Sequence, residues 1–339
     1  MTASPPELLT PPPQYSYLQD GFQAGFNLAH LHRRGIGYGS PASMRQLQRL
    51  RGLGVTHVAL TPFGYVDNVQ TTDIWYGSRL DRSLTDEDLL KEAQQAREVG
   101  LSVCIKPHIW SRAFWTSGKS RQDIRPDRWD EWFEHYTGFI KHYARVAETA
   151  KAELLCVGLE YLQATQDNPG AWGAVADACR TVYTGKLTYA ANWWEEVDAF
   201  ADWSSYDFIG VNAYYPLSEA PDPSAQALKA AWTPHLRHLK GLSQKNDRPL
   251  LFMEAGYRSI TGSVEEPWST SRNGAPNDAL QAKAYSALLA AAAENADWLK
   301  GIYWWKWFTD DNGREREDYC PMNKPAEDVL KQWWRDAGE

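Results

Sequence analysis

The feature of this sequence that most constrains its fold is an unbroken alternation of two kinds of segment. Short apolar runs, typical of buried strands, alternate with longer segments in which apolar residues recur every three or four positions, as on one helix face. The predicted strands cover Phe22–Leu28, Val55–Thr61, Ser102–His108, Leu154–Glu160, Leu187–Asn192, Phe208–Asn212, Leu250–Glu254 and Gly301–Trp305. The predicted helices cover Ser40–Leu53, Thr85–Val99, Trp129–Ala150, Pro169–Tyr183, Glu195–Phe200, Ala225–Gln244, Asp278–Asn295 and Ala326–Trp334.

Eight strand–helix units of uniform composition predict an α/β fold in which parallel strands close into a single (β/α)8 TIM barrel. The 339 residues suit this fold, which needs about 250 residues plus loops. An open doubly wound sheet is the alternative, but the glycines at 35, 37 and 39 lack the G-x-G-x-x-G spacing that would support it. We expect the proline-rich residues 1–16 to form a flexible lead-in and residues 17–339 to form the barrel.

Charge and composition exclude several kinds of partner. The net charge of −8 argues against nucleic acid, because binding phosphates requires a basic surface. No apolar run reaches the roughly 18 residues of a membrane span, so no membrane association is expected. The first residues lack a signal peptide, which predicts a cytoplasmic protein, or a secreted one if a native leader has been removed. We expect a monomer.

Metal and cofactor sites are not expected either. The four cysteines form no C-x-x-C pair, and nothing requires a disulfide. His30 and His32 lie close together, but two histidines on a loop are a weak metal site without a third ligand.

Chemically useful side chains gather at the predicted strand ends. In a (β/α)8 barrel, catalytic groups come from the carboxyl ends of the strands. Here these ends carry Lys106, His108, Glu160, Asn192, Asn212, Tyr214, Glu254, Trp304 and Trp305. The chain also has 17 Trp and 17 Tyr, and aromatic faces stack on sugar rings, although many of them must also fill the core.

Glu160 and Glu254 are the strongest catalytic candidates. Each closes an apolar strand, where a carboxylate is costly to bury and usually has a function. Strands four and seven lie roughly across a barrel from each other, so the two carboxyl groups could flank one glycosidic bond. If both glutamates point inward, strand alternation places Gly158, Cys156 and Phe252 inward as well. The alternative role for each glutamate is a salt bridge, for example with Lys106.

Several segments give the chain a family resemblance over nearly its whole length. They are Gly25-Phe26-Asn27, Ile105-Lys106-Pro107-His108, Val157-Gly158-Leu159-Glu160, Asp207 to Tyr215, Phe252 to Tyr257 and Gly301 to Trp305. With glutamates ending strands four and seven, the chain resembles clan A of the glycoside hydrolases and, within it, family 113, whose known members are chiefly β-1,4-mannanases. The resemblance implies a retaining mechanism with Glu160 as acid/base and Glu254 as nucleophile. It also implies that Tyr214 bonds the nucleophile and that Trp304 or Trp305 forms the floor under the cleaved bond.

The chain departs from the clan pattern at two positions. Leu159 stands where most members have Asn, so Asn192 or Asn212 is expected to supply the amide, and Thr61-Pro62-Phe63 replaces an Arg common at strand two. His108 is expected to bind sugar hydroxyls, and Lys106 either binds substrate or forms a buried ion pair. Trp75 and the segment from Trp110 to Trp115 lie on long loops, and their tryptophans are predicted either to line sugar subsites or to anchor the loops.

These observations predict a retaining glycoside hydrolase that cleaves β-linked chains, with β-1,4-mannan as the first choice. The alternatives are the same chemistry on glucan, xylan or a modified oligosaccharide, and a catalytically silent sugar-binding barrel. Retention predicts that the Glu160 and Glu254 carboxyl groups are about 5–5.5 Å apart.

Overall fold

A closed barrel of parallel strands forms the centre of the molecule. In this computed structural model the described residues are 7–11, 21–29, 37–77, 84–311 and 316–334. Among them, eight strands close the barrel in the order β1-β10-β9-β8-β7-β6-β4-β2, and every neighbouring pair is parallel. Their bounds are β1 Gln23–Ala29, β2 His57–Leu60, β4 Ser102–Ile105, β6 Leu154–Leu159, β7 Lys186–Asn192, β8 Phe208–Asn212, β9 Leu250–Ala255 and β10 Leu299–Phe308. The predicted (β/α)8 barrel is confirmed.

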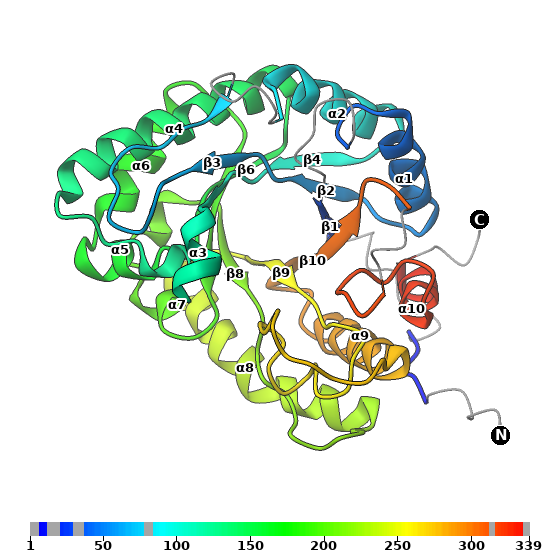
Figure 1. The fold of residues 1–339 in the computed structure, drawn as a ribbon. Helices are drawn as coiled ribbons and strands as arrows, with labels where there is room; N and C mark the ends of the chain where they lie inside the picture. The colour runs from blue at the N-terminus through cyan, green and yellow to red at the C-terminus, as the bar shows by residue number, and fades with distance from the viewer. Residues whose placement is uncertain (1–6, 12–20, 30–36, 78–83, 312–315, 335–339) are drawn as a thin grey trace.

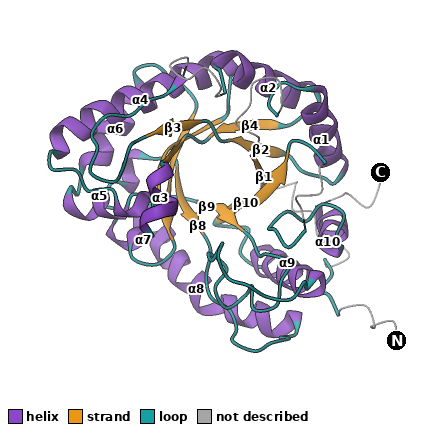
Figure 2. Ribbon diagram, in the orientation of Figure 1, coloured by secondary structure: helices purple, strands orange, loops and turns teal. Residues whose placement is uncertain are grey.

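Helices surround this ring of strands (Figures 1 and 2). The α-helices are α1 Pro41–Gly52, α2 Asp86–Glu98, α3 Arg112–Ser117, α4 Trp129–Ala150, α5 Leu162–Asp167, α6 Ala171–Arg180, α7 Glu196–Ala199, α8 Ala225–Asn246, α9 Asp278–Ala293 and α10 Pro325–Trp334. The described residues also include the short 3-10 helices η3 Arg121–Asp123 and η4 Trp203–Ser205. No helix of the described residues is long and apolar enough to cross a membrane.

A second, small sheet begins beyond two prolines that follow barrel strands. Pro62 follows β2, Pro107 follows β4, and a proline has no N–H to donate to a neighbouring strand. Beyond them, β3 (Phe63–Tyr65) pairs with β5 (His108–Trp110) in parallel. The predicted strand Ser102–His108 is therefore two strands, and the second carries His108 away from the barrel wall.

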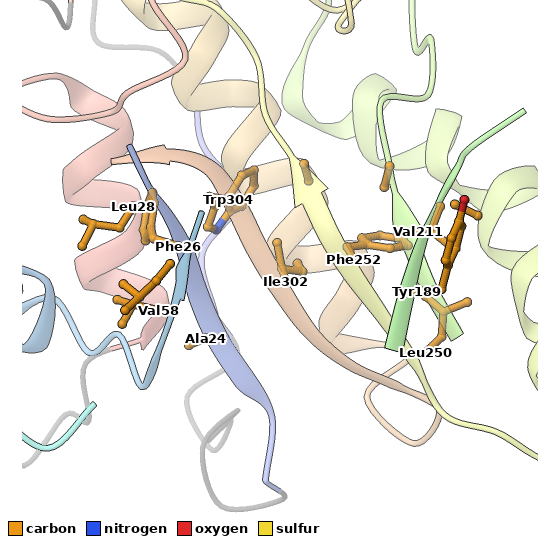
Figure 3. Close-up of a cluster of buried hydrophobic side chains, with 14 of the residues drawn as sticks. Ala24, Phe26, Leu28, Val58, Tyr189, Val211, Leu250, Phe252, Ile302 and Trp304 are labelled. Atoms are coloured by element: carbon orange, nitrogen blue, oxygen red, sulfur yellow. The ribbon is translucent and has the colours of Figure 1, made fainter. Parts of the chain in front are cut away.

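The core has two layers, one inside the barrel and one between the barrel and its helices. The inner layer consists of strand residues: Ala59, Cys104, Leu154, Cys156, Leu159, Ala190, Leu251, Met253 and Tyr303. The outer layer includes the side chains in Figure 3, where Phe252, Ile302 and Trp304 lie on the helix side of their strands.

The two layers show that some residues predicted to point into the barrel point outward instead. Phe252 belongs to the outer layer and packs on Trp232 of α8, at 5.7 Å between ring centroids, so it does not point inward. Gly158 also faces outward, because a Cβ there would lie 2.7 Å from the Tyr189 ring. Cys156 points inward as predicted. Counting back from the two glutamates fails because the strand register is irregular between Cys156 and Leu159 and, beside β9, between Val211 and Asn212.

Part of the predicted lead-in packs against the end of the barrel chain. The Leu9 N–H donates to Ser286 Oγ of α9 at 3.4 Å, and Trp333 Nε1 of α10 donates to the Leu9 carbonyl at 3.1 Å. Figure 1 shows this segment beside α10. Residues 7–11 thus pack on the outer helices rather than lying loose, whereas residues 1–6 and 12–16 lie outside the described residues.

Candidate active site

Glu160 stands at the carboxyl end of β6 in an unusual backbone conformation. Its φ of +56° lies in the left-handed region, which is uncommon for a residue with a side chain. The neighbouring strand β7 holds the peptide on both sides: Glu160 N donates to the Ala190 carbonyl at 3.0 Å, and Tyr161 N donates to the Tyr189 hydroxyl at 3.1 Å. This turn departs from strand geometry just where the carboxyl group leaves the barrel wall.

The Glu160 carboxyl group has one firm partner and one distant one. Asn212 Nδ2 donates to its Oε1 at 2.9 Å, and the Arg121 guanidinium lies 3.7 Å from its Oε2. Burial raises the pKa of Glu160, the Arg121 charge opposes the rise, and the Glu254 charge adds to it. A carboxyl group with a raised pKa can hold a proton and donate it, as a general acid must.

Glu254, on β9, has a different electrostatic environment. Its Oε1 accepts from Lys106 Nζ at 2.5 Å, and its Oε2 accepts from the Tyr214 hydroxyl at 2.8 Å. Burial and the Glu254 charge raise the pKa of Tyr214 well above its ordinary value, so the hydroxyl stays a donor. The predicted contact between Tyr214 and the expected nucleophile is present, and a nearby cation balances the carboxylate.

Lys106 is a partner of Glu254 rather than a substrate contact. Its side chain is fully buried, and its Nζ also donates to Asn27 Oδ1 at 3.0 Å and to the Met253 carbonyl at 3.4 Å. No surface of Lys106 is left for a sugar hydroxyl, so the substrate-binding role is wrong and the buried ion pair is the outcome.

Asn27 and Arg121 complete the site and were missed in the sequence. Asn27 Nδ2 donates to the Met253 carbonyl at 2.9 Å, so Asn27 links β1, Lys106 and the strand of Glu254. Its signal was available, because it is a polar residue within an apolar strand and buried polar groups are normally bonded. Arg121 gave no signal, since it lies in η3 on a loop without periodicity.

His108 and Trp305 lie together at the mouth. Their rings are stacked with 5.9 Å between centroids, and Arg121 Nη1 lies 2.9 Å from His108 Nδ1. The Lys106 ammonium is 5.7 Å from the centre of the Trp305 ring. Trp305 is half-buried, so one part of its surface remains open beside the Glu254 pair.

Trp304 lies on the opposite face of β10. It is fully buried and stacks on Tyr285 of α9 at 3.8 Å between ring centroids and 6° between planes. Figure 3 shows it on the helix side of the strand. Of the two tryptophans predicted as the floor, Trp305 is at the mouth, and Trp304 is a core residue that cannot touch a substrate.

Asn192 and Asn212 are adjacent in register at the ends of β7 and β8. Asn212 supplies the amide contact to Glu160 that the sequence leaves without a clear source. The Asn192 Nδ2 and Asn212 Oδ1 atoms are buried without a hydrogen-bond partner among the described residues. Buried amide atoms in this state can bond an incoming hydroxyl group.

An aromatic strip runs outward from this site along the small sheet. Consecutive ring centroids are 5.3 to 6.3 Å apart, in the order His108, Phe63, Tyr65, Trp110 and Trp115. Trp75 joins it through backbone hydrogen bonds with Tyr65 and has 38% of its surface exposed. Trp115, at the end of the segment Trp110 to Trp115, lies on α3 and is 81% exposed.

Metal ligands do not gather in this region. Within the described residues, no three His, Cys, Asp or Glu side chains are grouped as a metal would require. His30 and His32 lie outside the described residues. The absence of a metal requirement stays a prediction.

A (β/α)8 barrel with two glutamates in contrasting environments at its mouth has the framework of a glycoside hydrolase. The sequence model of Glycoside Hydrolase Family 113 matches residues 27–324, and the chain belongs to this family. The chain is thus a glycoside hydrolase. A search of curated proteins finds no match.

Solved structures support the same assignment. A β-1,4-mannanase of this family, solved as a complex, is 26% identical with a TM-score of 0.81, and the match covers 93% of this chain and 99% of that one. The β-mannanase AaManA from Alicyclobacillus acidocaldarius, in complex with ManMIm, is 28% identical with a TM-score of 0.81, covering 93% and 97%. An apo β-glucuronidase from Ruminococcus gnavus, 14% identical with a TM-score of 0.60, covers 92% and 50% and shares the fold alone.

Proposed function

We propose that this protein is a retaining β-glycosidase that cleaves β-1,4-mannan or its oligosaccharides, with Glu160 as acid/base and Glu254 as nucleophile. The observation that carries the proposal is the contrast between the two carboxyl groups. Glu254 is paired with a buried ammonium and a tyrosine hydroxyl, whereas Glu160 has a raised pKa and a more distant cation, the Arg121 guanidinium at 3.7 Å. Double displacement requires one carboxyl group that donates a proton and another that attacks as a carboxylate.

The proposed first step forms a glycosyl-enzyme. A Glu254 oxygen attacks the anomeric carbon, the glycosidic C–O bond breaks, and Glu160 gives its proton to the departing oxygen. The Lys106 and Tyr214 contacts fix the Glu254 carboxylate, so that little reorientation precedes attack.

The second step reverses these roles. The ionised Glu160 removes a proton from water, the water oxygen attacks the anomeric carbon, and the bond to Glu254 breaks. Two inversions give net retention, and the enzyme returns to its starting protonation. This mechanism keeps the predicted carboxyl separation of about 5–5.5 Å.

Mannan is the proposed substrate because two similar structures, 26% and 28% identical, are described as β-1,4-mannanase and β-mannanase. Mannose and glucose differ in configuration at the 2-hydroxyl. The buried amides of Asn192 and Asn212 are candidates for recognising that group. A panel of aryl β-glycosides and polysaccharides, with mannan, glucan and xylan included, tests the choice. If glucan or xylan is turned over faster than mannan, the substrate assignment changes to that polysaccharide. If none is turned over, a catalytically silent sugar-binding barrel is favoured.

Azide rescue tests the two catalytic roles. Glu160→Ala should still form the covalent intermediate from an activated aryl glycoside, because a good leaving group needs little protonation. Azide should then accelerate its second step and give a β-glycosyl azide. Glu254→Ala should be rescued only with the α-product, because azide then attacks the glycoside directly. The opposite pattern of products would exchange the two roles.

A further inference from the structure

Another buried carboxyl group, that of Glu196, lies near the proposed acid/base and takes no part in the reaction described above. Glu196, the first residue of α7, is fully buried. Its Oε1 accepts from the Tyr189 hydroxyl at 2.5 Å and from Thr165 Oγ1 at 3.1 Å, and its Oε2 accepts from the Asn192 N–H at 2.8 Å. Within the described residues, no Lys, Arg or His forms an ion pair with it. Such a group is costly to keep, and burial raises its pKa to about 7.

The hydrogen-bond partners of Glu196 connect it to the Glu160 turn on one side and to Asn192 on the other. The Tyr189 hydroxyl that donates to Glu196 also accepts the Tyr161 N–H at 3.1 Å. That N–H belongs to the peptide that follows Glu160, whose φ of +56° is a strained value. On the other side, the Asn192 backbone N–H donates to Glu196, and Asn192 is the register partner of Asn212, which bonds Glu160.

Packing leaves Tyr189 little freedom to move. Its ring lies 4.8 Å from the Trp172 ring and 4.5 Å from the Phe200 ring, measured between centroids. Gly158, two residues before Glu160, leaves the space that the Tyr189 ring occupies. The hydroxyl is therefore fixed in position by its ring and fixed in orientation by Glu196.

We propose that Tyr189 and Glu196 are positioning residues that hold the Glu160–Tyr161 peptide in its left-handed conformation and so direct the Glu160 carboxyl group toward the leaving oxygen. This inference rests on the proposed function, because it assigns the pair to the proton-donating step. Neither residue touches substrate. Their loss should impair proton donation more than nucleophilic attack.

The test compares Tyr189→Phe with Tyr183→Phe as a matched control. Tyr183 is also buried, and its hydroxyl donates to the Ala152 carbonyl at 2.8 Å, just before the amino end of β6. Both substitutions remove one buried hydroxyl beside the same strand, but only Tyr189 contacts the Glu160 turn. Glu196→Gln and Glu196→Ala complete the set, because Gln keeps a carbonyl acceptor for Tyr189 and Ala does not.

The readout is kcat/KM on aryl glycosides with good and poor leaving groups. We expect Tyr189→Phe to lower kcat/KM by about 10- to 100-fold on a poor leaving group, since small misplacement of a catalytic group has effects of this size. We expect less than about 3-fold on a dinitrophenyl leaving group, which needs little protonation. Tyr183→Phe should change both rates equally, and Glu196→Gln should retain more activity on the poor leaving group than Glu196→Ala.

Equal effects of Tyr189→Phe on the two substrates would overturn the proposal while leaving the glycosidase function in place. A wild-type protein inactive on every aryl β-glycoside would instead refute the proposed function. A crystal structure of Tyr189→Phe tests the positioning role independently of the glycosidase function. The role predicts that the Glu160 φ leaves the left-handed region or that the bond from Asn212 is lost, and an unchanged turn would overturn it.

Discussion

Replacing Lys106 by Met tests the electrostatics of the proposed nucleophile directly. Methionine keeps most of the length of the lysine stem but removes its charge, so Glu254 would be left nearly buried without a cation. Two unit charges 2.5 Å apart attract by about 6–7 kcal/mol at an effective dielectric constant of about 20. Part of this attraction offsets the desolvation of both ions, and breaking one partner of a buried pair typically costs about 3–5 kcal/mol. We expect Lys106→Met to lower the free energy of unfolding by about that amount.

Urea denaturation at pH 7, followed by circular dichroism, measures this change. The double variant Lys106→Met/Glu254→Gln should recover much of the lost stability, because it removes both charges. Glu254→Gln alone leaves the Lys106 ammonium buried without its counter-charge. The matched control is Arg128→Met, since Arg128 pairs with Asp130 on the surface at 3.2 Å, and its loss should change stability little. A destabilisation by Lys106→Met below about 1 kcal/mol, without coupling to Glu254, would refute the reasoning.

Four further outcomes are expected. Chelation with EDTA should leave hydrolysis unchanged, and activity lost on chelation and restored by one divalent ion would contradict this. Burial raises the pKa of Glu196 to about 7, so the folded state binds this proton more tightly than the unfolded state, and the free energy of unfolding should fall as pH rises from about 4.5 to 7. In Glu196→Gln the fall should be smaller by up to about 3 kcal/mol in the same denaturation assay, and an unchanged slope would show that Glu196 does not titrate there. Tyr214→Phe should lower kcat about 10- to 100-fold on an activated aryl glycoside, where glycosylation needs little acid, and unchanged kinetics would mean that the contact with Glu254 is incidental. Trp115→Ala should raise KM several-fold for long mannooligosaccharides but not for an aryl monosaccharide; equal effects on both would exclude a distant subsite.

The barrel could be predicted because its signals are local. Each strand and helix shows its own period, and eight such units leave few topologies. The placement of Glu160 and Glu254 at strand ends followed from the same pattern. The contact between Tyr214 and Glu254 was predicted only from the family resemblance.

The facing of individual side chains could not be predicted by counting residues. Each glutamate directly follows an inward-facing residue: Leu159 precedes Glu160, and Met253 precedes Glu254. The glutamate side chains nevertheless reach the site, whereas in a regular strand two successive side chains point to opposite faces. The register irregularities in β6 and beside β9 that cause this depend on how neighbouring strands pair. Strict alternation therefore placed Phe252 on the wrong face.

Contacts from distant loops were equally out of reach. Arg121 reaches Glu160 across 39 positions, through a turn with no periodic pattern. The contrast between Trp304 and Trp305 depends on which ring meets Tyr285, a partner on another helix. Sequence spacing gives the elements, and tertiary packing decides which side of each element faces the site.

The uneven exposure of the tryptophans divides their fluorescence into two groups. All 17 lie within the described residues, and seven of the largest buried side chains are Trp132, Trp172, Trp203, Trp232, Trp304, Trp307 and Trp334. Four others, Trp75, Trp115, Trp194 and Trp268, are at least 38% exposed. Iodide, which cannot enter the core, should quench the exposed group and spare these seven, which report unfolding instead. A sugar chain that covers Trp75 or Trp115 should then reduce the quenching, so binding can be followed without a label in a variant that no longer cleaves its ligand.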